Sequence, residues 1–353
     1  TGLNLTSPTN DTTPDLTYTV SDGSATVDIA IGGACSGSAL AVTPGAGLTI
    51  TLGALADGTH SCTITATDLS NNSSTENFSV MVDTSAPVLS ALSITSPTND
   101  STPDLTYTLI EVGGATADIA VGGDCSGSAL AVTPGAALSI TLGALADGVH
   151  SCTLTATDLA GNTDTENFSV TVDTTAPALS AISITSPTND TTPDLTYTVA
   201  DSLSATVDIL IGGACSGSAA AITPGAGLSI TLGALAEGPH SCTITATDLA
   251  GNTNTENFSV SVDTMAPTIA AVTGVTTPTN DSTPSYTFSS DEVGTIAYIG
   301  SCAAGITSAV AANNAITLNA LADGTFTNCD ITVTDAAGNV SNTLEINDFT
   351  VDT

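Results

Sequence analysis

The stretch that decides the fold is Val172-Asp173-Thr174-Thr175-Ala176-Pro177. The same motif occurs at residues 82–87 with Ser85 at its fourth place, and at residues 262–267 with Met265 there. Its first three residues return at 351–353. Each copy follows one alternating apolar run, so the chain is four copies of one module. We predict modules at residues 1–84 (with a truncated first strand), 85–174, 175–264 and 265–353, the last being the most divergent.

Module 2 shows the alternation most clearly. Leu105, Tyr107 and Leu109 repeat at every second residue, and so do Cys152 and Leu154. This period of two is typical of strands with one buried face, and no window has the period of a helix. Turn-forming residues separate seven such runs, at residues 88–95, 104–109, 115–121, 129–133, 137–142, 150–157 and 166–172. The predicted fold is all-β, with four tandem seven-stranded immunoglobulin-like sandwiches in a rod-like array.

The eight cysteines fall two to a module, and the members of each pair stand 27 positions apart. An even count at fixed spacing favours one disulfide per module and an oxidising compartment. A zinc site needs two more ligands per module, and module 4 lacks the only histidine in range. A bridge closing a loop of this length contributes about 3–4 kcal/mol of stability. The expected pairs are Cys35–Cys62, Cys125–Cys152, Cys215–Cys242 and Cys302–Cys329.

The charged side chains of this sequence are acidic. The chain has 35 Asp and Glu residues, no Lys or Arg, and a formal net charge of −35. Nucleic acid is excluded as a partner because its binding depends on Lys and Arg at phosphates, and an anionic membrane surface is excluded likewise. No apolar run approaches the length needed for membrane insertion. Solvent, metal ions or backbone N–H groups must therefore neutralise the acids; a solvated surface is one interpretation and metal binding is the other.

Four short motifs carry a resemblance to a known family: Asp173-Thr174-Thr175-Ala176-Pro177, Ser186-Pro187-Thr188-Asn189-Asp190, Ala146-Asp147-Gly148 and Thr157-Asp158-Leu159-Ala160-Gly161-Asn162. They recur along all four modules and resemble the bacterial Ig-like tandem repeats of large extracellular adhesins and surface fibre proteins. The resemblance implies an extracellular, rod-like stalk in which Ca²⁺ often binds at module junctions. Paired cysteines and the absence of basic residues depart from that family.

The sandwich topology also brings acidic residues together at each junction. The first interstrand loop and the end of the last strand lie at one end of a module, and the loop between the sixth and seventh strands lies at the other. Stacked modules would gather mutually repelling carboxylates, and an oxygen-seeking ion such as Ca²⁺ would remove that repulsion. The alternative is that these side chains only cap turns. The expected ligands are Asp11, Asp83, Asp158 and Asn162; Asp100, Asp173, Asp248 and Asn252; and Asp190, Asp263, Asp335 and Asn339.

Three histidines repeat at one structural position. His60, His150 and His240 each stand two residues before a cysteine. A catalytic triad needs a serine and an aspartate held around one histidine, and the sequence singles out no such set. We expect a surface or packing role for these histidines, and no enzymatic activity.

These observations predict a structural protein at the cell surface, either an adhesin stalk or the repeating subunit of a filament. Because the chain begins part-way through a module and ends on a module boundary, we expect it to be a piece of a longer protein or a processed subunit. The partners are then further repeats, or neighbouring copies that complete, head to tail, the strand shortened at Thr1. A module that binds a surface glycan is the alternative. Ca²⁺ is the one cofactor expected.

Overall fold

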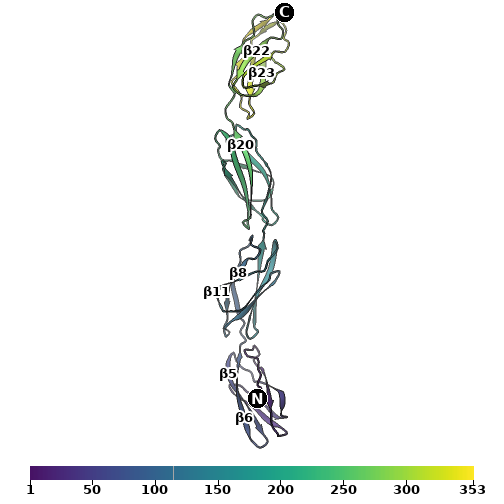
Figure 1. The fold of residues 1–353 in the computed structure, drawn as a ribbon, viewed down its shortest axis with the longest axis vertical. Helices are drawn as coiled ribbons and strands as arrows, with labels where there is room; N and C mark the ends of the chain where they lie inside the picture. Colours follow the sequence, from purple (N-terminus) through teal and green to yellow (C-terminus); the bar gives the residue numbers. More distant parts are fainter. Residues whose placement is uncertain (114) are drawn as a thin grey trace. The chain divides into compact units, whose positions relative to one another are not determined.

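The computed structural model describes residues 1–113 and 115–353. These residues form strands, turns and loops, and none of them forms a helix (Figure 1). The same described residues therefore include no helix able to cross a membrane. The chain divides into two compact units, Thr1–Thr175 and Ala176–Thr353. The first unit holds modules 1 and 2, and the second holds modules 3 and 4.

Module 2 is a two-layer antiparallel sandwich. One sheet has the strand order β11-β8-β7 and the other has the order β10-β9-β12-β13. The seven predicted strands are confirmed, with ends that shift by up to three residues. They are β7 Val88–Ser93, β8 Asp104–Ile110, β9 Ala117–Gly123, β10 Gly127–Val132, β11 Gly135–Thr141, β12 Gly148–Asp158 and β13 Thr163–Val172.

The core of module 2 lies between the two sheets, where the alternating apolar side chains meet. Leu105, Tyr107 and Leu109 of β8 are buried against Leu154 and Ala156 of β12 in one apolar cluster. Burying one such leucine contributes about 1.5–3 kcal/mol relative to leaving it in water. The period of two therefore fixes which face of each strand turns inward, as the sequence predicts.

Strand β7 departs from simple alternation. Ala91 has a φ of 51°, and the pairing register with β8 shifts between Ser90 and Ser93. This bulge adds one residue and turns the strand face. As a result Leu89 and Leu92, three positions apart, both pack on the core.

Modules 1 and 3 repeat this plan. In module 3 the sheet orders are β14-β15-β18 and β17-β16-β19-β20. Module 1 has a two-stranded sheet, β1-β4, beside the sheet β3-β2-β5-β6, and only an isolated bridge joins Asn4 to Thr17 of β1. The strands are β1 Asp15–Val20, β2 Val27–Gly33, β3 Gly37–Val42, β4 Gly45–Thr51, β5 Gly58–Asp68 and β6 Ser73–Val82, then β14 Ala178–Ser183, β15 Asp194–Ala200, β16 Val207–Gly213, β17 Gly217–Ile222, β18 Gly225–Thr231, β19 Gly238–Asp248 and β20 Thr253–Val262.

Module 4 keeps the layers but breaks the two longest strands. Residues 327 and 328 interrupt the strand that matches β12, and Asn347 leaves the ladder to bond Val275. The sheets have the orders β21-β22-β25, β24-β23-β27-β28 and β26-β29. The strands are β21 Ile269–Thr273, β22 Ser285–Ser290, β23 Gly294–Gly300, β24 Ser308–Ala309, β25 Asn313–Thr317, β26 Gly324–Phe326, β27 Cys329–Thr334, β28 Leu344–Glu345 and β29 Phe349–Val351.

One disulfide staples each module, as predicted. Cys125 stands two residues after the end of β9, and Cys152 lies in the adjacent strand β12, in register with Gly123. The bridge therefore joins neighbouring strands of one sheet. The pairs are Cys35–Cys62, Cys125–Cys152, Cys215–Cys242 and Cys302–Cys329, with Cα–Cα separations of 5.3, 5.4, 5.4 and 5.2 Å.

Candidate metal site

The linker between modules 1 and 2 is held in place as it leaves β6. The backbone N–H of Asp83 donates to the carbonyl of Thr9 at 2.9 Å, so the first interstrand loop of module 1 fixes its path. The Asp83 side chain is 5% exposed. In the second unit, Asp263 donates in the same way to the carbonyl of Thr188 at 2.9 Å. The linker aspartate therefore starts from a fixed backbone position in both units.

A second carboxylate clamps the next two linker residues. Asp57 accepts hydrogen bonds from the N–H of Thr84 at 3.1 Å, the hydroxyl of Thr84 at 2.8 Å and the hydroxyl of Ser85 at 3.1 Å. Glu237 binds Thr264 through the same two groups in module 3. The turn Ala56-Asp57-Gly58 therefore also has a connecting role, because the Asp57 carboxylate binds module 1 to the linker that follows it.

The clamp responds to pH. Hydrogen bonds from Thr84 and Ser85 outweigh desolvation and hold the pKa of Asp57 below its ordinary value. A group whose pKa is lower in the folded state stabilises that state above its unfolded pKa of about 3.9, and the contribution is lost as pH falls through the folded pKa. We expect Asp57→Asn to lower the melting temperature slightly at pH 7 and not at all near pH 2. Calorimetry across pH measures this, with the exposed Glu76→Gln as charge control; a pH-independent difference contradicts it.

The turn after β12 presents another buried acid. Asp158 is 6% exposed, and its Oδ1 accepts hydrogen bonds from the N–H groups of Ala160 at 2.9 Å and Asn162 at 2.8 Å. The Asn162 side-chain amide donates to Asp158 Oδ2 at 2.8 Å and to the Asp83 carbonyl at 2.7 Å. One asparagine therefore links the turn of module 2 to the linker from module 1. Asn339 links Asp335 and the Asp263 carbonyl in the same way.

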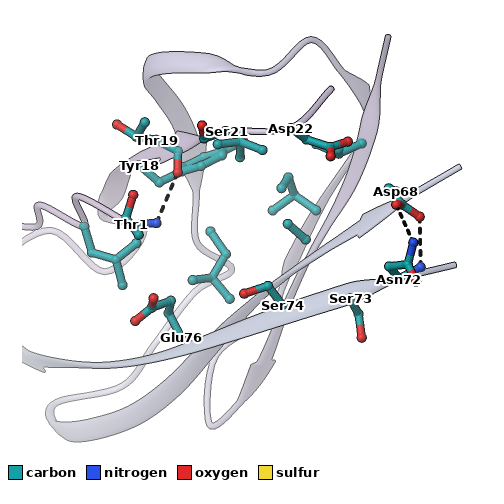
Figure 2. Close-up of a pocket in the computed structure, with 16 residues that line it drawn as sticks. Thr1, Tyr18, Thr19, Ser21, Asp22, Asp68, Asn72, Ser73, Ser74 and Glu76 are labelled. Atoms are coloured by element: carbon teal, nitrogen blue, oxygen red, sulfur yellow. Dashed lines mark hydrogen bonds between the residues drawn. The ribbon is translucent and has the colours of Figure 1, made fainter. Parts of the chain in front are cut away.

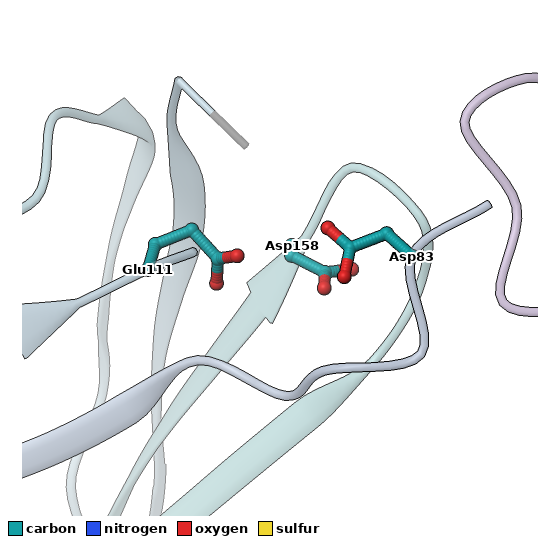
Figure 3. A group of neighbouring side chains, drawn as sticks. All are labelled: Asp83, Glu111 and Asp158. Atoms are coloured by element: carbon teal, nitrogen blue, oxygen red, sulfur yellow. The ribbon is translucent and has the colours of Figure 1, made fainter. Parts of the chain in front are cut away.

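Three carboxylates meet at this point in each unit. Asp83, Glu111 and Asp158 each offer one oxygen, and these oxygens lie within 4.8 Å of one another (Figure 3). Gly113, with a φ of 115°, allows the Glu111 loop this close, because a Cβ there would overlap Asp83 Oδ2. The corresponding group in the second unit is Asp263, Glu292 and Asp335.

The electrostatics of the second group reflect this crowding. Burial, followed by the negative charges of Asp263 and Asp291, raises the pKa of Glu292. Burial is the largest single influence on Asp335 and acts to raise its pKa, but the hydrogen bonds from Asn339, Gly338 and Ala337 together outweigh burial and leave that pKa lowered. The chain has no Lys or Arg to compensate these charges. Carboxylate oxygens are hard, anionic ligands of the kind that Ca²⁺ prefers, and these three would supply part of the six to eight oxygens that it takes.

The sequence of the modules matches a known family. The sequence model of the bacterial Ig-like domain matches residues 2–84, 94–174 and 182–264, which is more than half of the chain. The chain belongs to the bacterial Ig-like domain family. No curated protein matches the sequence of this Ig-like chain.

Several solved structures share extended similarity with this Ig-like chain. A tetra-tandem repeat from the extending region of a large adhesion protein is 21% identical, covers 99% of each chain and has a TM-score of 0.28. Drosophila N-cadherin EC1-4 is 12% identical over 95% of this chain and 94% of its own, with a TM-score of 0.24. A biofilm-associated protein domain is 10% identical over 99% and 96%, with a TM-score of 0.21. Likenesses at this level do not indicate what the chain binds.

The Ig-like chain brings together part of two of the three predicted ligand sets. Asp83 and Asp158 converge with Asn162, and Asp263 and Asp335 converge with Asn339. Within the described residues, Asp11 and Asp190 lie outside the groups of three and accept hydrogen bonds from Thr13 and Thr192, as turn caps do. Asp100 caps its turn likewise, through Thr102. A role in metal binding for these caps, and for Asp173, Asp248 and Asn252, stays a prediction.

Two members of these carboxylate groups were missed from the sequence, Glu111 and Glu292. A signal for the first was present, because Asp22, Glu111 and Asp201 each stand four residues after the tyrosine of the second strand. Glu292 stands six residues after Tyr286, in a differently built loop. The loop between the second and third strands therefore supplies an acid that strand periodicity alone does not locate.

Each of the three histidines contacts a backbone carbonyl four residues before it in the chain. The ring Nε2 of His60 lies 2.7 Å from the carbonyl of Ala56, and His150 and His240 make the same contact with Ala146 and Ala236. Each contact joins the loop that carries the clamping acid to the strand that follows it. This agrees with the packing role expected from their repetition.

Proposed function

We propose that this chain is a structural part of an extracellular bacterial surface protein: a stalk of Ig-like repeats whose junctions are stiffened by Ca²⁺. The observation that carries the proposal is the group formed by Asp83, Glu111 and Asp158, because it includes the linker itself and two loops of the next module. An ion bound to all three would couple the direction of the linker to module 2. Without the ion, carboxylate repulsion would favour an open, mobile joint.

The disulfides support the extracellular location. Four bridges in one chain are favoured outside the reducing cytosol. They also suit a stalk, because each bridge limits how far a module can extend if it unfolds. Among the described residues, none of the exposed large apolar side chains is aromatic. A glycan site built on exposed aromatic rings is therefore not favoured.

Calcium titration tests the proposal directly. We expect isothermal titration calorimetry to detect Ca²⁺ binding to the full chain, and small-angle scattering to show a longer, less variable particle with Ca²⁺ than with EDTA. Mg²⁺ should act more weakly, because it requires tight octahedral geometry and releases its water reluctantly. The absence of both the binding heat and the change in scattering would rule out calcium-stiffened joints.

A further inference from the structure

A second asparagine motif repeats along the chain, away from the candidate metal site. The sequence Asn-Phe-Ser occurs at residues 77–79, 167–169 and 257–259. It has the form Asn-x-Ser/Thr, which is the acceptor motif for N-linked glycosylation of exported proteins. Such a motif is usable only where the fold leaves room for a sugar on the asparagine, so its place in the structure is decisive.

In module 2 the motif lies in the middle of β13 with its asparagine outward. Phe168 packs on the core and Val170 is buried. Because successive side chains of a strand point to opposite faces, Asn167 and Ser169 share the outer face, and both are exposed. The same holds for Asn77 and Ser79 in β6, and for Asn257 and Ser259 in β20.

The neighbours across the ladder are small and uncharged. Thr153 and Ser151 of β12 stand opposite Asn167 and Ser169. In modules 1 and 3 the equivalent side chains line an open hollow; they are Ser61, Thr63, Asn77 and Ser79, and Ser241, Thr243, Asn257 and Ser259. The chain has 35 acidic residues, yet none of them takes these positions. The first sugar would therefore meet open space and hydroxyl groups.

The strands that carry the motif are open edges. β6, β13 and β20 are the outermost strands of their sheets, and each has ten residues. Apart from an isolated bridge at its last residue, the outer side of each is unpaired among the described strands. An open edge invites pairing with another chain, and an inward-pointing charge is one device against it. Glu76 is such a charge, on the inner side of β6 (Figure 2).

Module 4 has neither the long edge nor the Asn-Phe-Ser motif. Its last two strands, β28 and β29, have two and three residues. The sequence there is Asn347-Asp348-Phe349, with no hydroxyl residue at the third place. The Asn347 side chain accepts from the N–H of Val275 at 2.8 Å and donates to its carbonyl at 3.0 Å. The motif thus accompanies the long open edge and is missing where that edge is broken.

The other repeated Asn-x-Ser/Thr motif is placed differently. Asn10 Nδ2 lies 3.8 Å from the position that a Cβ on Gly161 would take, and Asn189 Nδ2 lies 3.7 Å from the one on Gly338. Each of these asparagines therefore faces a loop of the module that follows. An oligosaccharide there would push the two modules apart.

We propose that Asn77, Asn167 and Asn257 are N-glycosylation sites whose oligosaccharides cover the open edges of modules 1 to 3. The donor is an oligosaccharide joined to a lipid through a diphosphate. Nδ2 of the asparagine forms a bond to C1 of the first sugar, and the bond from C1 to the diphosphate breaks. The leaving lipid diphosphate keeps that electron pair and takes the proton lost by Nδ2.

Transfer takes place before each module folds, because the folded ladder holds β13 against β12 along its whole length. These sites require export of the chain, which the four disulfides favour. They depend neither on calcium at the junctions nor on a role as a stalk.

Mass spectrometry of the full chain, purified from the cells that produce it, tests the sites. The chain has no Lys or Arg, so a protease of broad specificity replaces trypsin. Electron-transfer fragmentation then locates the sugar on a residue. We expect sugar on Asn77, Asn167 and Asn257, and none on Asn10 or Asn189. Bare asparagine at the first three positions, or sugar at either of the last two, would overturn the assignment.

Variants produced in the same cells test the motif itself. Ser169→Ala keeps the asparagine but removes the hydroxyl, and should lose the sugar of module 2 while the other two stay. Ser151→Ala, opposite it on β12, leaves the motif intact and should keep all three sugars. Circular dichroism shows whether both variants fold. Sugar retained on Asn167 in the first variant, or lost in the second, would contradict the role of the motif.

Light scattering tests whether the sugars cover the edges. High salt screens the repulsion between chains of net charge −35, so that strand edges can meet. The glycosylated chain should then stay monomeric, and the chain with Asn77→Gln, Asn167→Gln and Asn257→Gln should associate. Asn280→Gln, an exposed position in module 4, is the control and should stay monomeric. A triple variant that remains monomeric would overturn the covering role.

Discussion

Replacing Cys125 and Cys152 together by alanine is expected to lower the free energy of unfolding of module 2 by about 3–4 kcal/mol. The bridge closes a loop of 27 residues and so restricts the unfolded chain. Both cysteines are also buried in the core, where their removal leaves space. Because Tyr107 is the module's one aromatic ring among the largest fully buried side chains, little bulky packing compensates for the loss.

Hydrogen exchange resolved by peptide measures this effect within the full chain, because core amides report the opening free energy of their own module. Amides of β9 and β12 should exchange faster, while those of module 3 provide an internal control. The same measurement on the reduced wild-type chain separates the effect of losing the disulfide bond from the effect of losing the sulfur atoms. Unchanged exchange in β12 would contradict the prediction.

The same change in module 4 should have a larger structural effect. There, β27 pairs with β28 only at Asp330–Glu345 and Ile331–Leu344. In module 2 the ladder between β12 and β13 extends from Gly148–Val172 to Thr157–Thr163. With a shorter ladder beside it, the Cys302–Cys329 bridge carries more of the stability of its module. We expect Cys302→Ala with Cys329→Ala to unfold module 4 first.

Glu111→Gln is expected to change the stability of the first unit in opposite directions with and without calcium. In EDTA the variant should be slightly more stable, because one of three mutually repelling charges is gone. At a calcium concentration about one hundred times the dissociation constant, the wild type gains about 2.7 kcal/mol from binding, and the variant should lose most of that gain. Glutamine keeps the size of the side chain, and the hydrogen bonds of Asp158 and Asp83 stay in place.

Differential scanning calorimetry with calcium and with EDTA compares the two forms. Glu292→Gln is the matched variant in the second unit, and each substitution should affect the transition of its own unit only. The exposed Glu166→Gln controls for the loss of one negative charge. A Glu111→Gln chain that keeps the full calcium-dependent shift would show that this carboxylate is not a ligand.

The fold could be predicted from the sequence because its signals are local and repeated four times. The alternation of Leu105, Tyr107 and Leu109 indicates which face of the strand is buried. The spacing of the cysteines agrees with a sheet in which the third and sixth strands are adjacent. Alternation fails where the backbone leaves the regular strand. The bulge at Ala91 lets Leu89 and Leu92 share one face, and no periodicity marks it because alanine is unusual at positive φ.

The candidate site could be predicted only in part. Asp83 and Asp158 follow from topology, because the linker and the turn after the sixth strand must meet when two modules stack. Glu111 comes from a loop whose course depends on packing against the linker. The clamp by Asp57 was missed for the same reason, since a carboxylate in a turn does not reveal which neighbouring segment will donate to it.

The sequence by itself determined the repeat, the strands, the disulfide pairing and the family, because each depends on spacing along the chain. The tertiary structure alone decided which acids share a site. It placed Glu111 beside Asp83, and it showed that the Asp11 carboxylate accepts a hydrogen bond from Thr13 as a turn cap does. Distances between loops arise from the packing of two sheets, and a one-dimensional pattern does not contain them.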